Sequence, residues 1–281
     1  MNKKGFLAGL TFFLVSLLLF VSILNAVIPK SNTELTKQDF LSQKQVKFSY
    51  IAIGDSLTEG VGDTTDQGGF IPLLSQELTS TYQYKVEYSN YGVSGNTSKQ
   101  ILKRMKTESE IEQDLKKADL MTLTVGGNDV MAVIRKNLTK LEVSSFVKPA
   151  SEYQSRLRQI INLARKENAN LPIYVLGIYN PFYLNFPEMT EMQGIIDNWN
   201  KATEAIVKEY DNVYFVAIND LIYKGIEGEE SEKQASSSQT TVINDALFTG
   251  DHFHPNNVGY QIMANAVMEE ISETKDKWKK D

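Results

Sequence analysis

Apolar residues recur along the chain in two patterns, short continuous runs and longer stretches with helical spacing. The short runs are rich in β-branched and aromatic residues and predict strands at 50–53, 84–91, 119–125, 171–178 and 213–218. Apolar residues that return every three or four positions predict helices at 70–78, 98–115, 130–138, 151–166, 191–210 and 255–271. Strands that alternate with helices indicate an α/β fold, in which parallel strands are joined by right-handed crossovers.

The N-terminus has a different pattern from the rest of the chain. Lys3 and Lys4 precede an uncharged, mostly apolar run of 24 residues, 5–28. As a helix this run would extend about 36 Å, enough to cross the hydrocarbon core of a bilayer. We therefore predict that residues 1–29 form a single-pass transmembrane helix in the cell membrane, with the two lysines inside and the remaining chain outside.

A cleaved signal peptide is the alternative for this segment, and it would export and secrete the rest of the chain. The apolar run is longer than the usual signal-peptide core, and no clean small-x-small cleavage site precedes Pro29. These two features favour the uncleaved anchor.

The remaining chain is predicted to hold one domain. Residues 30–46 are polar and lack apolar periodicity, which is typical of a linker, residues 47–273 form the domain, and 274–281 form a polar tail. Within the domain, 219–246 contains acidic and Ser-rich stretches and is predicted to be an exposed loop. A lid over a substrate is the alternative for this loop.

Composition narrows the classes of function. The net charge of −6 argues against nucleic acid as the main partner. The absence of cysteine excludes a thiol nucleophile, disulfides and thiolate metal sites. With His252 and His254 as the only histidines, a multi-histidine zinc site is not expected.

Small and polar residues follow the first three predicted strands, at 54–56, 92–95 and 126–129. The carboxyl ends of parallel strands lie at one edge of a sheet, where open α/β folds bind ligands. Asp251 lies three residues before His254, so it can orient the imidazole to accept a proton from Ser56. Each feature alone is also explained as an ordinary turn or helix cap. Together they supply the nucleophile, base, orienting carboxylate and hydrogen-bond donors that acyl transfer requires.

Four motifs in this order resemble the blocks of the SGNH (GDSL-type) hydrolase family. They are GDSLTEG at 54–60, GVSG at 92–95, GGND at 126–129 and DHFHP at 251–255. The resemblance runs from residue 47 to 271 and is nearest to bacterial esterases of the lysophospholipase-L1-like type. It implies a flavodoxin-like three-layer α/β/α sandwich with a five-stranded parallel sheet.

The resemblance also implies site residues and an activity. Ser56, His254 and Asp251 would form a catalytic triad that cleaves carboxylic esters through an acyl-enzyme. The oxyanion hole would consist of the backbone N–H groups of Ser56 and Gly92 and the side-chain amide of Asn128. The chain would be an extracytoplasmic serine esterase or lipase-type hydrolase that needs no metal and no cofactor.

Other functions stay open at this point. An acyltransferase would use a hydroxyl group of a cell-surface glycan in place of water, and a membrane-anchored binding module would keep the fold without catalysis. A phosphate-binding flavodoxin-like domain is less consistent, because its Gly-rich loop would contain Lys or Arg and neither 54–62 nor 92–96 does.

The substrate is predicted only as an ester-bearing small molecule, lipid or cell-wall glycan. The aromatic residues that follow the fourth predicted strand are candidates to contact an acyl chain or sugar ring: Tyr179, Phe182, Tyr183 and Phe186. Packing within the core or on a helix is the alternative for them. His252 is predicted to be a structural or rim residue outside the triad.

Overall fold

A computed structural model of the chain describes residues 3–27, 45–137, 142–183, 189–225 and 244–278. The chain divides into two units, Met1–Lys44 and Gln45–Asp281. The first contains helix α1 (Lys3–Val27), so the predicted N-terminal helix is present. Among the described residues, however, no helix combines the length and apolar character needed to cross a membrane.

The second unit is built on a five-stranded sheet. Its strands are β1 (Lys47–Gly54), β2 (Lys85–Gly92), β3 (Leu120–Thr124), β4 (Ile173–Leu176) and β5 (Val213–Val216). They lie in the order β2-β1-β3-β4-β5, and every neighbouring pair is parallel. The predicted five-stranded parallel sheet is therefore confirmed, with the strand order of flavodoxin-like folds.

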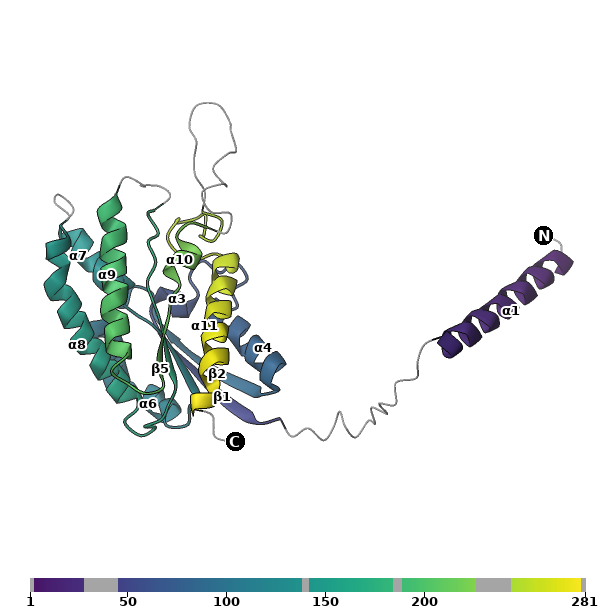
Figure 1. The fold of residues 1–281 in the computed structure, drawn as a ribbon, viewed down its shortest axis with the longest axis horizontal. Coiled ribbons are helices and arrows are strands. Elements are labelled where there is room, and N and C mark those ends of the chain that lie inside the picture. The colour runs from purple at the N-terminus through teal and green to yellow at the C-terminus, as the bar shows by residue number, and fades with distance from the viewer. Residues whose placement is uncertain (1–2, 28–44, 138–141, 184–188, 226–243, 279–281) are drawn as a thin grey trace, which may run out of the picture. The chain divides into compact units, whose positions relative to one another are not determined.

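Helices cover both faces of this sheet (Figure 1). They are α3 (Ser56–Glu59), α4 (Phe70–Tyr82), α5 (Ser98–Thr107), α6 (Ser109–Leu115), α7 (Gly127–Lys136), the 3₁₀ helix η1 (Val143–Phe146), α8 (Val147–Ala164), α9 (Thr190–Val207), α10 (Asn219–Ile222) and α11 (Asn257–Trp278). Alternate residues of β1 point to opposite faces, so Ile51 and Ile53 pack with α5 to α9 while Tyr50 and Ala52 pack with α4, α10 and α11. The three predicted layers are present.

The order of the strands creates a topological switch point at β1. The chain leaves β1 for the outer strand β2, then returns past β1 to form β3 on its other side. Successive crossovers on the two sides of β1 therefore run in opposite directions. At such a switch point the loops after the neighbouring strands separate, and in this fold class ligands bind there.

Two helices differ most from their predicted bounds. The helix predicted at 98–115 is split, because Glu108 adopts an extended conformation (φ −96°, ψ 104°) between α5 and α6. Helix α11 continues beyond residue 273 into the predicted polar tail. There Thr274 is buried, with its hydroxyl 2.7 Å from that of Tyr174, and the Trp278 indole donates to the same Tyr174 oxygen.

Two predicted loops lie largely outside the described residues. Of the linker predicted at 30–46, the structure describes only 45 and 46. Of the loop predicted at 219–246, it describes 219–225, which begins with α10, and 244–246.

Candidate active site

Strand β1 and the turn after it place Ser56 at the switch point. Asp55 follows the strand and caps α3 by accepting a hydrogen bond from the Leu57 N–H (3.1 Å). A side chain on Gly54 would lie 2.2 Å from the Thr124 hydroxyl oxygen, so only glycine fits there. Ser56 is the first residue of α3 and is buried, and its N–H has no partner within the helix. Both its hydroxyl and its N–H are thus available at the carboxyl edge of the sheet.

The second contributor is the histidine loop, residues 247–255. Its ends pair as an antiparallel bridge between Leu247 and Pro255, and the Phe248 N–H donates to the His254 carbonyl (2.8 Å). Asn256 fastens the base of the loop, since its amide donates to the Leu247 carbonyl (3.0 Å) while its side-chain oxygen caps the first turn of α11. The loop is therefore closed by its own backbone and by one capping residue.

Three predicted side chains meet in a continuous hydrogen-bonded chain. His254 Nε2 lies 2.9 Å from Ser56 Oγ, and His254 Nδ1 lies 2.6 Å from Asp251 Oδ2. Asp251 Oδ1 also accepts the N–H groups of Phe253 and His254. Burial acts to raise the pKa of Asp251, but the hydrogen bonds from His254 and the backbone hold this pKa below its ordinary value. An ionised carboxylate beside Nδ1 favours the tautomer with its proton there, which leaves Nε2 as the acceptor that faces the Ser56 hydroxyl.

His252 lies outside this chain of contacts. It occupies the turn of the histidine loop with a left-handed φ of 54°, and its N–H donates to the Phe248 carbonyl (2.8 Å). His252 is exposed to solvent. The structure places it at the rim of the turn.

Asn128 and Gly92 are the other predicted oxyanion donors. They differ in whether a hydrogen remains free to bind a ligand. Asn128 donates one of its two amide hydrogens to the Asn96 carbonyl (3.1 Å), which leaves the second hydrogen for a ligand. The Gly92 N–H already donates to Asn90 Oδ1 (2.8 Å). A side chain on Gly92 would lie 2.1 Å from the Glu59 nitrogen, so this glycine is required for close packing on α3. The structure therefore argues against Gly92 as an oxyanion donor.

The loop after β2 contains a different candidate donor. Its other backbone N–H groups are occupied: Val93 donates to the Gly54 carbonyl, Ser94 to the Glu59 carboxylate and Asn96 to the Val93 carbonyl. Among the described residues the Gly95 N–H has no partner, and its φ of +77° is the left-handed conformation that glycine tolerates. The motif at 92–95 alone did not indicate which of its glycines has a free N–H.

Buried polar side chains beneath Ser56 were not predicted as part of the site. The Thr124 hydroxyl donates to Asp55 Oδ1 (2.8 Å) and lies 2.8 Å from the Thr58 hydroxyl. Burial raises the pKa of Asp55, and the hydrogen bond from Thr124 only partly offsets this. A polar residue that ends a buried strand, as Thr124 does, is a signal that can be recognised in the sequence.

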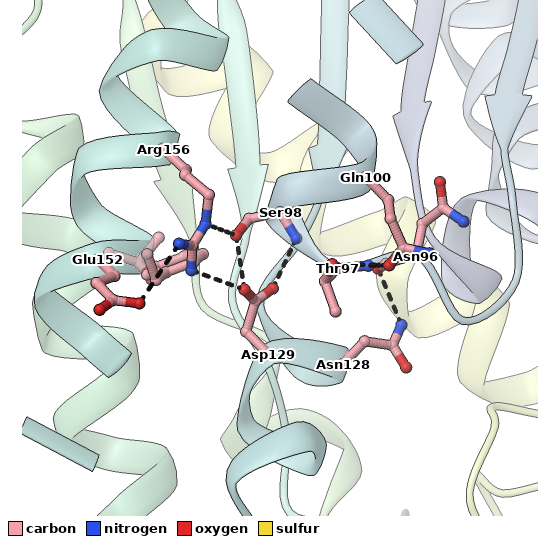
Figure 2. A network of polar contacts seen from close by, with 10 residues as sticks. Asn96, Thr97, Ser98, Gln100, Asn128, Asp129, Glu152 and Arg156 are labelled. Atoms are coloured by element: carbon pink, nitrogen blue, oxygen red, sulfur yellow. Dashed lines mark hydrogen bonds and ion pairs between the residues drawn. The ribbon is translucent and has the colours of Figure 1, made fainter. Parts of the chain in front are cut away.

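Beside Asn128, the Asp129 carboxylate binds Ser98 and Arg156 (Figure 2).

A small cavity of about 40 Å³ opens beside Ser56 and Asn128. Its walls are mainly apolar and include Leu57, Val125, Ile178, Tyr179, Pro181 and Phe253. Within the described parts of the chain, no group of three or more His, Asp or Glu side chains is arranged to hold a metal ion.

The predicted aromatic residues differ in their burial and contacts, and Phe182 and Tyr183 are half-buried. Tyr179 is buried, lines the cavity and donates its hydroxyl to the Phe253 carbonyl (2.7 Å). The Phe182 ring lies 6.1 Å from the Phe253 ring, and Tyr183 contacts Tyr223 edge-on. Phe186 lies outside the described residues.

Comparison with known proteins identifies the family of the chain. The model of the GDSL-like Lipase/Acylhydrolase family matches residues 52–262. The chain belongs to this family. The resemblance to SGNH (GDSL-type) hydrolases is thereby confirmed, and the chain is a hydrolase that acts on ester bonds.

Individual similar proteins cover most of this chain. Uncharacterized protein YpmR of Bacillus subtilis (strain 168) is 33% identical over 221 residues, covering 78% of this chain and 80% of the relative. Spore germination lipase LipC of Bacillus licheniformis is 25% identical over 222 residues, covering 78% and 93%. The solved structure of lipase Lip_vut3 from a goat rumen metagenome superposes with a TM-score of 0.65 at 22% identity, covering 79% and 96%, and shows the same fold.

Proposed function

We propose that this family member is a serine esterase that cleaves carboxylic esters through Ser56, His254 and Asp251. The observation that carries the proposal is the unbroken chain of contacts from Ser56 Oγ through the imidazole to the Asp251 carboxylate, 2.9 Å and 2.6 Å long. A buried serine hydroxyl paired with an oriented imidazole is the arrangement that activates a nucleophile.

The reaction would proceed in two stages. Ser56 Oγ attacks the ester carbonyl while its proton moves to His254 Nε2, and Asp251 stabilises the imidazolium. The same proton then passes to the leaving alkoxide, which departs as the alcohol and leaves an acyl-enzyme on Ser56. Water attacks the acyl-enzyme, gives its proton to His254, and the acid leaves as Oγ regains a proton.

The negative charge that forms on the carbonyl oxygen needs donors on the other side of Ser56. We assign this role to the Ser56 N–H, the free amide hydrogen of Asn128 and the Gly95 N–H, the last in place of Gly92. Support comes from the hydrogen bonds that already occupy Gly92 and leave these three groups available. Donors held in place before the reaction are the usual main source of transition-state stabilisation.

The size of the cavity favours short acyl groups. The cavity beside Ser56 is small, about 40 Å³, and mainly apolar, which supports an acetyl or similarly short acyl group. Acetylated glycans and small esters are therefore the preferred substrate class. Lipid esters are the second candidate, because the relative LipC is named as a lipase.

We also propose that the domain acts outside the cytoplasm. The support is the sequence of the first unit, in which Lys3 and Lys4 precede an uncharged apolar run, a pattern that directs export whether or not it is removed. Fractionation of cells that produce the C-terminally tagged chain tests this, and the mass of the exported product shows whether cleavage occurs. A product found only in the cytoplasm would refute the location.

The activity test uses the purified chain on p-nitrophenyl esters of increasing acyl length, beside Ser56→Ala. We expect turnover of acetyl and propionyl esters that disappears in the variant. A preference for long acyl chains would replace the glycan hypothesis with the lipid hypothesis. If esters are bound but never cleaved, the chain is a binding module, and transfer to added sugar hydroxyls in place of water would make it an acyltransferase.

A further inference from the structure

Two loops that contribute to the oxyanion side are joined by a buried carboxylate. Asp129 Oδ2 accepts the Ser98 N–H (2.7 Å), and Oδ1 accepts the Ser98 hydroxyl (2.6 Å). Ser98 is fully buried and Asp129 is 8% exposed. A carboxylate removed from water in this way requires charged or polar partners on each oxygen.

Arg156 of α8 completes this arrangement (Figure 2). Its Nε–H donates to the Ser98 oxygen (2.7 Å), and its terminal N–H donates to Asp129 Oδ1 (3.2 Å). Because the Ser98 hydroxyl accepts from Arg156, its single hydrogen is directed to Asp129. The guanidinium therefore supplies the compensating charge and also fixes the direction of the serine hydrogen bond.

This network lies directly beside Asn128. Asn128 precedes Asp129, and the Asn96 carbonyl that holds the Asn128 amide is two residues before Ser98. The loop after β2 and the start of α7 are thus joined by two links, Asn128 to Asn96 and Asp129 to Ser98. The Asn128–Asn96 link sets the rotation of the Asn128 amide, since only the amide nitrogen can donate to a carbonyl. The Asp129–Ser98 link holds together the two backbone segments that contain Asn128 and Asn96.

We propose that Arg156 is a positioning residue for ester hydrolysis, which holds the Asp129–Ser98 link and thereby directs the second Asn128 amide hydrogen at the oxyanion. The proposal rests on the proposed esterase function. A role in stability alone would be a different outcome, in which Arg156 only joins α8 to α5 and α7. The two roles are separable because positioning acts through Asn128 and stability does not.

The experiment is a double-mutant cycle between Arg156 and Asn128, measured as kcat and KM for p-nitrophenyl acetate with folding checked by circular dichroism. Arg156→Met should lower kcat by about 10–100-fold with KM within about twofold, because a slightly misplaced catalytic group costs up to ~10² in rate and acts in the transition state. In the Asn128→Ala background, the same substitution should lower kcat less than about twofold, since the group it positions is gone.

Arg158→Met is the matched control. Arg158 lies on the same helix and forms a surface ion pair with Glu209 (2.6 Å), so its loss should leave kcat unchanged. If Arg156→Met unfolds the chain, Arg156→Lys replaces it in the cycle, because lysine retains the charge but not the forked pair of donors.

Three outcomes would overturn the proposal. They are wild-type kcat in the folded Arg156 variant, equal losses with and without the Asn128 amide, and an equal loss of kcat in Arg158→Met. If the wild-type enzyme shows no turnover that depends on Ser56, the proposed function itself is refuted, and the role of Arg156 with it.

Discussion

Compared with the histidine side of the proposed site, the oxyanion side draws on many more elements of the fold. Asp251 and His254 lie in one short loop, which is closed by its own backbone bonds and by Asn256. Asn128, in contrast, is held by the loop after β2, and its neighbour Asp129 by α5 and α8. One side is local in sequence, whereas the other is assembled from distant segments.

The difference suggests how each side responds to change. A local loop retains its geometry as long as its own ends are closed, so substitutions elsewhere should affect it little. A group held from three elements depends on the packing of all of them. We therefore expect distant substitutions to reduce kcat through Asn128 more often than through His254.

The largest expected effect is on the histidine side. His254→Ala should lower kcat by about 10⁴-fold or more, because the serine then lacks its base. His252→Ala is the matched control and should retain kcat within about twofold, as its side chain lies outside the hydrogen-bonded chain. Steady-state kinetics on p-nitrophenyl acetate compares the two. Equal losses in both variants would refute the assignment of the base.

Asn128→Ala tests the oxyanion side and should lower kcat by about 10²–10³-fold with the fold intact. The control is Asn137→Ala at the end of the same helix, where the side-chain amide donates to the Val133 carbonyl (2.8 Å). KM should change little in either variant, since the donor acts in the transition state. Full activity in Asn128→Ala would remove this residue from the proposed oxyanion hole.

Asn256→Ala tests whether the histidine loop depends on its capping residue. Loss of a helix cap costs about 0.5–2 kcal/mol, which corresponds to a Tm about 1–8 °C lower in a domain of this size. The decrease in kcat should exceed the decrease caused by an ordinary surface substitution, because the Asn256 amide also closes the histidine loop. Thermal unfolding and kcat are measured together. A lower Tm with unchanged kcat would show that the loop is closed by its backbone alone.

Asp55→Asn should have the smallest effect, and that effect should depend on pH. Burial raises the pKa of Asp55 above its ordinary value of 3.8, so ionisation is less favourable in the folded chain than in the unfolded chain. The resulting loss of stability is absent below pH 3.8 and grows as pH rises toward the raised pKa. Asparagine keeps the side-chain oxygen that Leu57 and Thr124 bind but has no charge.

The difference in Tm between Asp55→Asn and wild type should therefore favour the variant more at pH 7 than at pH 3.5. Thermal unfolding at the two values measures it. A difference that stays constant with pH would show that Asp55 does not titrate with a raised pKa.

The two sides also differ in how far they could be predicted from the sequence. The Asp251 and His254 pair is recognisable because both residues lie within one turn, and Ser56 because it follows a buried strand. Arg156 gives no such signal. It is one of several charges on an amphipathic helix, and its partners Asp129 and Ser98 lie 27 and 58 positions away.

Gly92 shows a second limit. A glycine in a motif indicates either a free N–H or a lack of room for a side chain, and sequence does not distinguish the two. Here the Asn90 side chain occupies the Gly92 N–H and α3 occupies the space beside it. The five strands were predictable because β-branched runs and helical spacing are local properties. The bounds of α5, α6 and α11, in contrast, depend on contacts formed after folding.

The separation of Ser56 and His254 along the chain has a consequence for biosynthesis. Ser56 and His254 are 198 positions apart, and the histidine loop immediately precedes α11, which packs against α4. A nascent chain can thus complete all five strands while its serine still lacks a base. Hydrolysis would begin only when the last helix docks, so incomplete or C-terminally truncated chains would be inert toward esters they meet before synthesis ends.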